Sequence, residues 1–174
     1  DYDYVLILSG DQLYQMDYEA MVNFHVSNGG EITIGTIPVK AKEAHAFGIL
    51  KSNENNEIVS FIEKPSDDLL PEWTSEVPEN LAKQGRNYLA SMGIYVFSKG
   101  VLARLLRDNP GMDFGKEIIP EAIENCKVLS YPFDSYWTDI GTIPSFFEAN
   151  ISLTDNIPLF NLFGDPVFTR PRML

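Results

Sequence analysis

The order of apolar and polar segments at the start of the chain is the feature that most limits its fold. Residues 5–8 (Val-Leu-Ile-Leu) form an unbroken apolar run that ends at residues 9–11 (Ser-Gly-Asp), which predicts a short strand buried on both faces. An aspartate-capped helix is expected over residues 17–27, where Asn-Gly-Gly follows, and the β-rich residues 32–37 predict the next strand. Because strand, helix and strand in this order build α/β sheets, we predict an α/β fold.

The rest of the chain continues to alternate between the two kinds of element. Further strands are expected at residues 48–51, 57–62, 88–97 and 128–131, and further helices at residues 79–84, 99–107, 116–124 and 143–153. The first two of these strands are predicted to form a hairpin, because Asn-Glu-Asn-Asn between them is typical of a turn. Residues 65–87 form a long connection of the kind that serves as a lid or binding loop. We expect residues 1–153 to be part of one domain and residues 154–174 to connect it to another.

The composition excludes several classes of partner. The 13 basic and 25 acidic residues give a net charge of −12, and so acidic a chain repels the phosphate backbone of nucleic acids. Cys126 is the single cysteine, which excludes an intrachain disulfide and a cysteine-rich metal site and fits the reducing cytoplasm. No apolar run reaches the roughly 18 residues that cross a bilayer. We therefore expect a cytoplasmic protein that binds neither nucleic acid nor membrane.

Two aspartates are candidate magnesium ligands. Asp11 follows the first predicted strand, and ligands of open α/β sheets bind beyond the carboxyl ends of the strands. Asp139 lies in the segment Tyr-Trp-Thr-Asp-Ile-Gly-Thr at residues 136–142. Two carboxylates on one hard cation are typical of phosphate chemistry, in which substrate oxygens complete the coordination shell. Alternatively, Asp11 caps a turn, and Asp139 or Thr142 begins the helix that follows.

The segment Glu63-Lys64-Pro65 ends a predicted strand and opens the long connection. Because a proline disfavours helical geometry in the residue before it, we expect Lys64 to be extended and to point outward. A lysine placed there can act as a point charge for a phosphate, and Glu63 can accept hydrogen bonds from sugar hydroxyls. For an isolated Glu-Lys-Pro, however, a surface ion pair of little energetic value is the simpler interpretation.

Three further segments contain glycines or caps of interest. Gly93 lies within an apolar strand, where a glycine marks either the close approach of a ligand or a β-bulge. Gly48, at the start of a strand, is a weaker signal of the same kind. Asp113, in Asp-Phe-Gly-Lys, is interpreted as the N-cap of the helix after it.

Taken in order, these motifs resemble a known family. They are Leu-Ser-Gly-Asp-Gln-Leu-Tyr at residues 8–14, Ala-Phe-Gly at 46–48, Phe-Ile-Glu-Lys-Pro at 61–65, Ala-Ser-Met-Gly-Ile-Tyr-Val-Phe at 90–97, Asp-Phe-Gly-Lys at 113–116 and the Asp139 segment at 136–142. The chain resembles glucose-1-phosphate adenylyltransferase (ADP-glucose pyrophosphorylase) over essentially its whole length. The resemblance implies a Rossmann-like sugar-nucleotidyltransferase fold, with a mixed, mostly parallel sheet flanked by helices. It also implies that the first strands of the fold precede Asp1 and that a left-handed β-helix domain follows residue 174.

The resemblance further implies an activity and a set of site residues. ATP and glucose 1-phosphate would be joined to give ADP-glucose and pyrophosphate, the committed step toward glycogen or starch. The implied roles are a catalytic Mg²⁺ held by Asp11 and Asp139, a sugar phosphate bound by Lys64, and glucose hydroxyls held by Glu63, Ser91 and the backbone near Gly48 and Gly93.

The departures from the family pattern leave alternatives open. The family has His where this chain has Gln12, and its Gly-rich ATP loop and much of its effector-binding surface would precede Asp1. We therefore expect the chain alone to be inactive, and we expect the unpaired edge of the strand at residues 5–8 to promote self-association. The resemblance suggests a tetrameric parent. The alternatives are a pyrophosphorylase for another sugar nucleotide, a non-catalytic regulatory subunit, and a domain that only binds a sugar phosphate.

Overall fold

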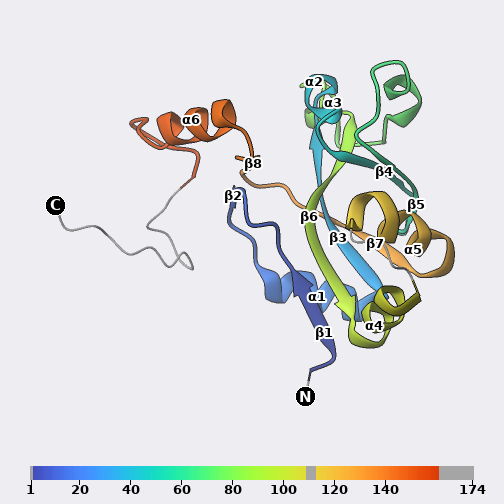
Figure 1. Ribbon diagram of the computed structural model, residues 1–174. Helices are drawn as coiled ribbons and strands as arrows, with labels where there is room; N and C mark the ends of the chain where they lie inside the picture. The colour runs from blue at the N-terminus through green and yellow to red at the C-terminus, as the bar shows by residue number, and fades with distance from the viewer. Residues whose placement is uncertain (1, 109–112, 161–174) are drawn as a thin grey trace, which may run out of the picture. The chain divides into compact units, whose positions relative to one another are not determined.

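The computed structural model describes residues 2–108 and 113–160 (Figure 1). Of these, residues 2–8 and 18–133 form one compact unit, and residues 9–17 and 134–160 form a second. The first unit therefore interrupts the second in the sequence. Most of the predicted connector at residues 154–174 lies outside the described residues.

The first unit is built on a six-stranded sheet (Figure 1). Its strands are β1 (Tyr4–Ile7), β3 (Ile32–Val39), β4 (Gly48–Ser52), β5 (Ile58–Glu63), β6 (Tyr88–Ser98) and β7 (Val128–Pro132). They are ordered β5-β4-β6-β3-β7, and β1 also pairs with β6. A mixed α/β architecture is thus confirmed, and each predicted strand is present within two residues of its expected bounds.

The expectation of a mostly parallel sheet is wrong for the residues that the structure describes. Only β3 and β7 pair in parallel, whereas the pairs β1–β6, β3–β6, β4–β5 and β4–β6 are antiparallel. That expectation was implied by the resemblance, and the apolar runs of the sequence could not correct it, because a short apolar run does not specify the direction in which a strand pairs. The hairpin of β4 and β5 is confirmed, and its turn is held by Asn53 Oδ1, which accepts from the backbone N–H groups of Asn55 and Glu57.

β1 is less buried than its apolar sequence predicts. It pairs with β6 in the register Tyr4↔Ser98 to Ile7↔Tyr95, and its side chains are exposed or half-buried. Leu8 lies beyond the strand and is 43% exposed. Among the described residues β1 has a strand on one side only, so its other edge is open to pairing.

Helical segments accompany this sheet. They are α1 (Tyr18–Ser27), α2 (Ala41–Ala44), the 3₁₀ turn η1 (Leu70–Trp73), α3 (Glu79–Ala82), α4 (Lys99–Asp108), the π-helical turn η2 (Phe114–Ile118) and α5 (Ile119–Asn125). Two of them, η1 and α3, lie within the long connection at residues 65–87. The helix predicted at 116–124 is split into a π-helical and an α-helical part. Asp113 is its N-cap, as predicted, because its side chain accepts from the N–H of Lys116 at 3.0 Å.

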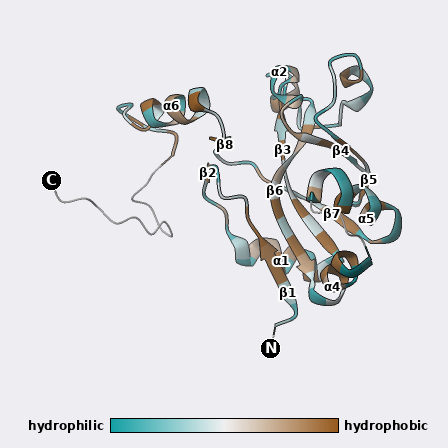
Figure 2. Cartoon of the chain, viewed as in Figure 1, coloured by the Kyte–Doolittle hydropathy of each residue, from teal (hydrophilic) through white to brown (hydrophobic). Residues whose placement is uncertain are grey.

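The apolar core lies where β3, β6 and β7 meet α4, η2 and α5, and these strands carry many apolar residues (Figure 2). Phe97 is fully buried and lies 5.8 Å, between ring centroids, from Phe114 of η2. His25 of α1 is also fully buried, with its ring nitrogens 2.8 Å from Thr33 Oγ1 and 3.2 Å from Ser98 Oγ. Burial lowers the pKa of His25, because a charged imidazolium would be poorly solvated there.

The second unit contains a two-stranded antiparallel sheet and one long helix. β2 (Gln12–Tyr14) pairs with β8 (Trp137–Asp139), and α6 (Ile143–Ser152) follows. Thr142 caps α6, since its Oγ1 accepts from the N–H of Ser145 at 3.2 Å. In neither unit does any helix of the described residues have the length and apolarity required to cross a membrane.

Candidate functional site

The second unit brings together the two aspartates that the sequence singles out. Gln12 pairs with Asp139 across β2 and β8, and the N–H of Ile140 donates to the carbonyl of Asp11 at 2.9 Å. A β-carbon added to Gly141 would lie 3.0 Å from Asp139 Oδ1 and 3.1 Å from Asp11 Oδ2. The two carboxylates therefore both lie next to the backbone of Gly141, which has no side chain.

Local hydrogen bonds fix the orientation of this carboxylate pair. Ser9 Oγ donates to Asp11 Oδ1 at 2.6 Å, and the N–H of Gly141 donates to Asp139 Oδ1 at 2.9 Å. Trp137 Nε1 donates to Gln12 Oε1 at 3.1 Å, so the residue that departs from the family pattern is tied to β8. Because Thr142 caps α6, Asp139 is not required for that purpose.

The pair has the donor chemistry of a magnesium site that is completed by substrate. Mg²⁺ is commonly bound through one or two carboxylates, with water and substrate phosphates filling the remaining positions. Among the described residues no group of three or more His, Cys, Asp or Glu side chains is placed to enclose a metal ion. Asp11 and Asp139 thus fit a shared, substrate-completed cation and do not fit an all-protein metal cage.

The first unit places Glu63 and Lys64 at the end of β5. Glu63 lies opposite Gly48 in the hairpin, and the N–H of Lys64 donates to the carbonyl of Phe47 at 3.0 Å. A β-carbon on Gly48 would lie 2.9 Å from Glu63 Oε2 and 2.3 Å from Phe61 Cζ. Gly48 is therefore required for packing on this strand pair, whatever else its backbone binds.

The backbone of Lys64 differs from the extended geometry expected before Pro65. Its φ is +49°, in the left-handed region that side chains other than glycine seldom adopt. This conformation departs from the extended geometry that a following proline favours, and in it the N–H of Lys64 donates to the carbonyl of Phe47. Strain of this kind persists only where the surrounding structure enforces it, and it is concentrated at functional sites.

The charges around Glu63 are closely spaced. Lys64 Nζ lies 4.0 Å from Glu63 Oε1, with side-chain exposures of 60% and 23% respectively, so this ion pair is a weak source of stability. Burial raises the pKa of Glu63, and Asp113 raises it further, whereas Lys64 and Lys116 oppose the shift. Glu63 is thus a partly desolvated acceptor next to an accessible cation.

Ser91 and Gly93 lie on β6, where Ser91 is buried and Gly93 is half-buried. Gly93 has a φ of +68°, and the β3–β6 register shifts between Ile34 and Thr36, opposite this segment. The N–H of Gly93 donates to Ser91 Oγ at 3.3 Å. The strand pairing is therefore irregular at Gly93, in agreement with the β-bulge interpretation, whereas the close approach of a ligand stays a prediction.

Sequence reasoning missed the contribution of the Asp-Phe-Gly-Lys segment to the surroundings of Glu63. It gave Asp113 only the role of a helix cap, yet Asp113 and Lys116 both act on the Glu63 carboxyl. A β-carbon on Gly115 would lie 2.8 Å from Glu63 Oε2. The signal available in the sequence was a glycine beside a helix cap, which by itself is no indication of such a contact.

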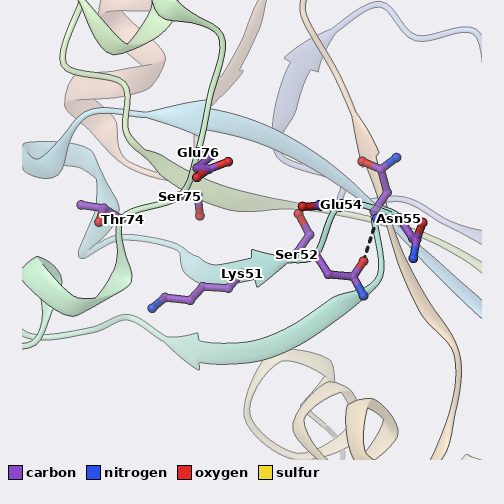
Figure 3. Close-up of a pocket in the computed structure, with 9 residues that line it drawn as sticks. Lys51, Ser52, Glu54, Asn55, Thr74, Ser75 and Glu76 are labelled. Carbon is purple, nitrogen blue, oxygen red and sulfur yellow. Dashed lines mark hydrogen bonds between the residues drawn. The ribbon is translucent and has the colours of Figure 1, made fainter.

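A separate hollow of about 720 Å³ lies at the far end of β4, between residues 51–56 and 74–76 (Figure 3). It is lined by polar side chains, including Lys51, Glu54 and Glu76. None of the predicted site residues lines it. This hollow therefore has no part in the chemistry assigned to Glu63 and Lys64.

The sequence is similar to known enzymes over nearly all its length. Residues 1–156 match the model of the nucleotidyl transferase family. The chain is 41% identical over 167 residues to a glucose-1-phosphate adenylyltransferase of Lachnospira eligens, a match that covers 94% of this chain and 36% of that protein. It is 39% identical over 180 residues to glucose-1-phosphate adenylyltransferase 1 of Alkalilimnicola ehrlichii, covering 95% of this chain and 40% of that protein. The chain thus spans about two-fifths of the length of these curated relatives, and the resemblance inferred from its motifs is confirmed.

Proposed function

This chain belongs to the nucleotidyl transferase family, and from that premise we propose that it is part of a glucose-1-phosphate adenylyltransferase. The reaction would join ATP and glucose 1-phosphate to give ADP-glucose and pyrophosphate. The single observation that carries this proposal is the convergence of Asp11 and Asp139 on Gly141. Such a carboxylate pair is what a magnesium-dependent transfer of a nucleotidyl group requires.

The proposed mechanism needs no protein nucleophile. A phosphate oxygen of glucose 1-phosphate attacks the α-phosphorus of ATP, and the bond to the departing pyrophosphate breaks. Mg²⁺ held by Asp11 and Asp139 would neutralise phosphate charge. The other residues act by positioning, which is the main requirement for an in-line transfer between two bound anions.

Each proposed substrate contact has a physical basis. The Lys64 ammonium is largely exposed, so it can meet the phosphate of glucose 1-phosphate without first leaving a buried position. The Glu63 carboxylate is partly desolvated, which strengthens the hydrogen bonds that it accepts from sugar hydroxyls. Ser91 and the backbone near Gly48 and Gly93 are proposed to contact the remaining hydroxyls.

We also propose that the protein works in the cytoplasm as a homo-oligomer. The net charge of −12 and the single cysteine suit a reducing, soluble environment. The open edge of β1 and the exposed apolar side chains of α6, among them Ile143 and Phe147, are surfaces that another chain could cover.

Calorimetric titration of the chain with glucose 1-phosphate in the presence of Mg²⁺ tests the central proposal. We expect binding by the intact chain and a loss of about tenfold or more in Lys64→Ala, because a hydrogen bond to a charged group is removed. Lys83→Ala is the matched control, since Lys83 is an exposed lysine paired with Glu79 at 2.7 Å. No binding by the intact chain, or equal binding by Lys64→Ala, would contradict the proposal.

A further inference from the structure

Two glycines lie against the carboxylate of Glu63. A β-carbon on Gly48 would be 2.9 Å from Glu63 Oε2, and one on Gly115 would be 2.8 Å from the same oxygen and 3.1 Å from Cδ. Real β-carbons essentially never approach other atoms this closely. The carboxylate therefore occupies space that any other residue at either position would fill.

The two glycines differ in what else they touch. A β-carbon on Gly48 would also lie 2.3 Å from Phe61 Cζ, so a substitution there disturbs apolar packing. At Gly115 the nearest atoms belong to Glu63, and the next is Asp113 Oδ1 at 3.5 Å. A methyl group at Gly115 is thus accommodated by movement of one side chain, that of Glu63.

The backbone around Gly115 cannot easily move away instead. The ring of Phe114, the residue before it, stacks on the ring of Tyr95 with 5.7 Å between their centroids, and Ile118 is 1% exposed. Asp113 caps the turn through the N–H of Lys116, and its own N–H donates to Glu117 Oε2 at 3.1 Å. The η2 turn is therefore fixed from both sides and forms a firm surface for the carboxylate.

We propose that Gly115 is a positioning residue, which sets where the Glu63 carboxylate lies and so determines how well the site accepts sugar hydroxyls. The part of this inference that concerns sugar binding rests on the proposed function, whereas the placement of Glu63 does not. Asp113 and Lys116 act on the Glu63 carboxyl with opposite charges, so displacement of the carboxylate also changes its electrostatic surroundings.

The test compares Gly115→Ala with Gly100→Ala. Gly100 lies in α4, and a β-carbon there meets nothing within 4 Å. Gly100→Ala therefore measures the effect of replacing glycine by alanine where the new methyl group displaces no side chain. We expect Gly115→Ala to shift the carbon-13 resonance of the Glu63 carboxyl and to move its pKa toward the ordinary value, because the group enters solvent. We expect glucose 1-phosphate to bind about tenfold more weakly, as when a hydrogen bond to a charged group is lost, with both readouts unchanged in Gly100→Ala.

A second substitution separates displacement from general damage. Glu63→Asp shortens the side chain by one methylene, so in the Gly115→Ala background it should recover part of the lost affinity. If Gly115→Ala fails to fold, the double variant Gly115→Ala with Glu63→Ala should fold, since the obstructing atoms are gone. A double variant that is also unfolded would overturn the inference.

The outcomes separate this inference from the proposed function. An unchanged Glu63 resonance in Gly115→Ala would overturn the positioning role, as would an equal loss of binding in Gly100→Ala. If the intact chain binds no glucose 1-phosphate, the proposed function fails. The Glu63 titration would still decide whether Gly115 places the carboxylate.

Discussion

Lys64 allows a direct measurement of backbone strain at the candidate site. Its φ of +49° is disfavoured for any residue with a β-carbon, at a cost of about 1–2 kcal/mol. Glycine lacks this cost. Its larger conformational freedom in the unfolded chain, however, destabilises the folded state by about 0.5–1 kcal/mol and so cancels part of the gain. We therefore expect Lys64→Gly to be more stable than Lys64→Ala by about 0.75 kcal/mol, the difference between the midpoints of these two terms.

Comparing the two variants with each other removes the contribution of the charge. Both lack the ammonium group and its 4.0 Å pair with Glu63, which for so exposed a lysine is worth about 0–1 kcal/mol. The free energy of unfolding is measured by urea denaturation and checked by thermal melting, where about 1 kcal/mol corresponds to about 2–4 °C in a domain of this size.

Asn56 supplies a comparison outside the candidate site, since its φ is +59°. Asn56→Gly should likewise be more stable than Asn56→Ala. Equal stability of the two Lys64 variants, or a less stable Lys64→Gly, would refute the strain argument. Both Lys64 variants should lose glucose 1-phosphate affinity alike, and retention by Lys64→Gly would instead reject the role of the charge.

Two further predictions concern protons and metal. Burial lowers the pKa of His25 below 6.5, so the unfolded chain takes up the proton first as the pH falls. The contribution of neutral His25 to the free energy of unfolding should be fully present above about pH 6.5. Below that pH, the free energy of unfolding should decrease by up to about 1.4 kcal/mol per pH unit until the pH reaches the folded-state pKa, and urea unfolding measures this decrease. His25→Gln should lack this slope and the exposed His45→Gln should keep it, and a slope shared by all three proteins would exclude His25 as its source. Asp139→Asn should weaken Mg²⁺ binding, whereas Asp134→Asn should not. Binding is monitored in a Mg²⁺ titration by the change in the NMR resonance of the Gly141 amide, which donates to Asp139. Equal Mg²⁺ affinity in the intact chain and Asp139→Asn would rule out the carboxylate pair as the metal site.

Local elements could be predicted from the sequence because their causes are local. The turn held by Asn53 joins the predicted hairpin, and the caps at Asp113 and Thr142 begin helices where the sequence indicates. The direction of strand pairing could not be predicted in this way, because apolar runs do not encode it. The φ of Lys64 was also missed, because the residue before a proline is expected to be extended, and the tertiary contacts at Lys64, such as its hydrogen bond to Phe47 just before β4, cannot be read from the local sequence.

The candidate site was predictable only in part, for the same reason. No spacing rule joins Asp11 to Asp139, and their convergence followed from the resemblance to a family and not from the residues themselves. The contact between Gly115 and Glu63 links segments far apart in the chain, and no sequence pattern in either segment predicts it. Motifs name residue types, whereas the tertiary fold decides which of them meet.

The interruption of the second unit by the first has a consequence for folding. The bond from Trp137 to Gln12 joins residues 125 positions apart, whereas the β4–β5 hairpin forms between neighbours. Closing so long a loop carries a large entropic cost before any contact repays it, so β2 and β8 should pair late. The aspartate pair would then exist only in chains that have completed folding. A cation that binds this pair would stabilise the finished state selectively and draw the last folding step to completion.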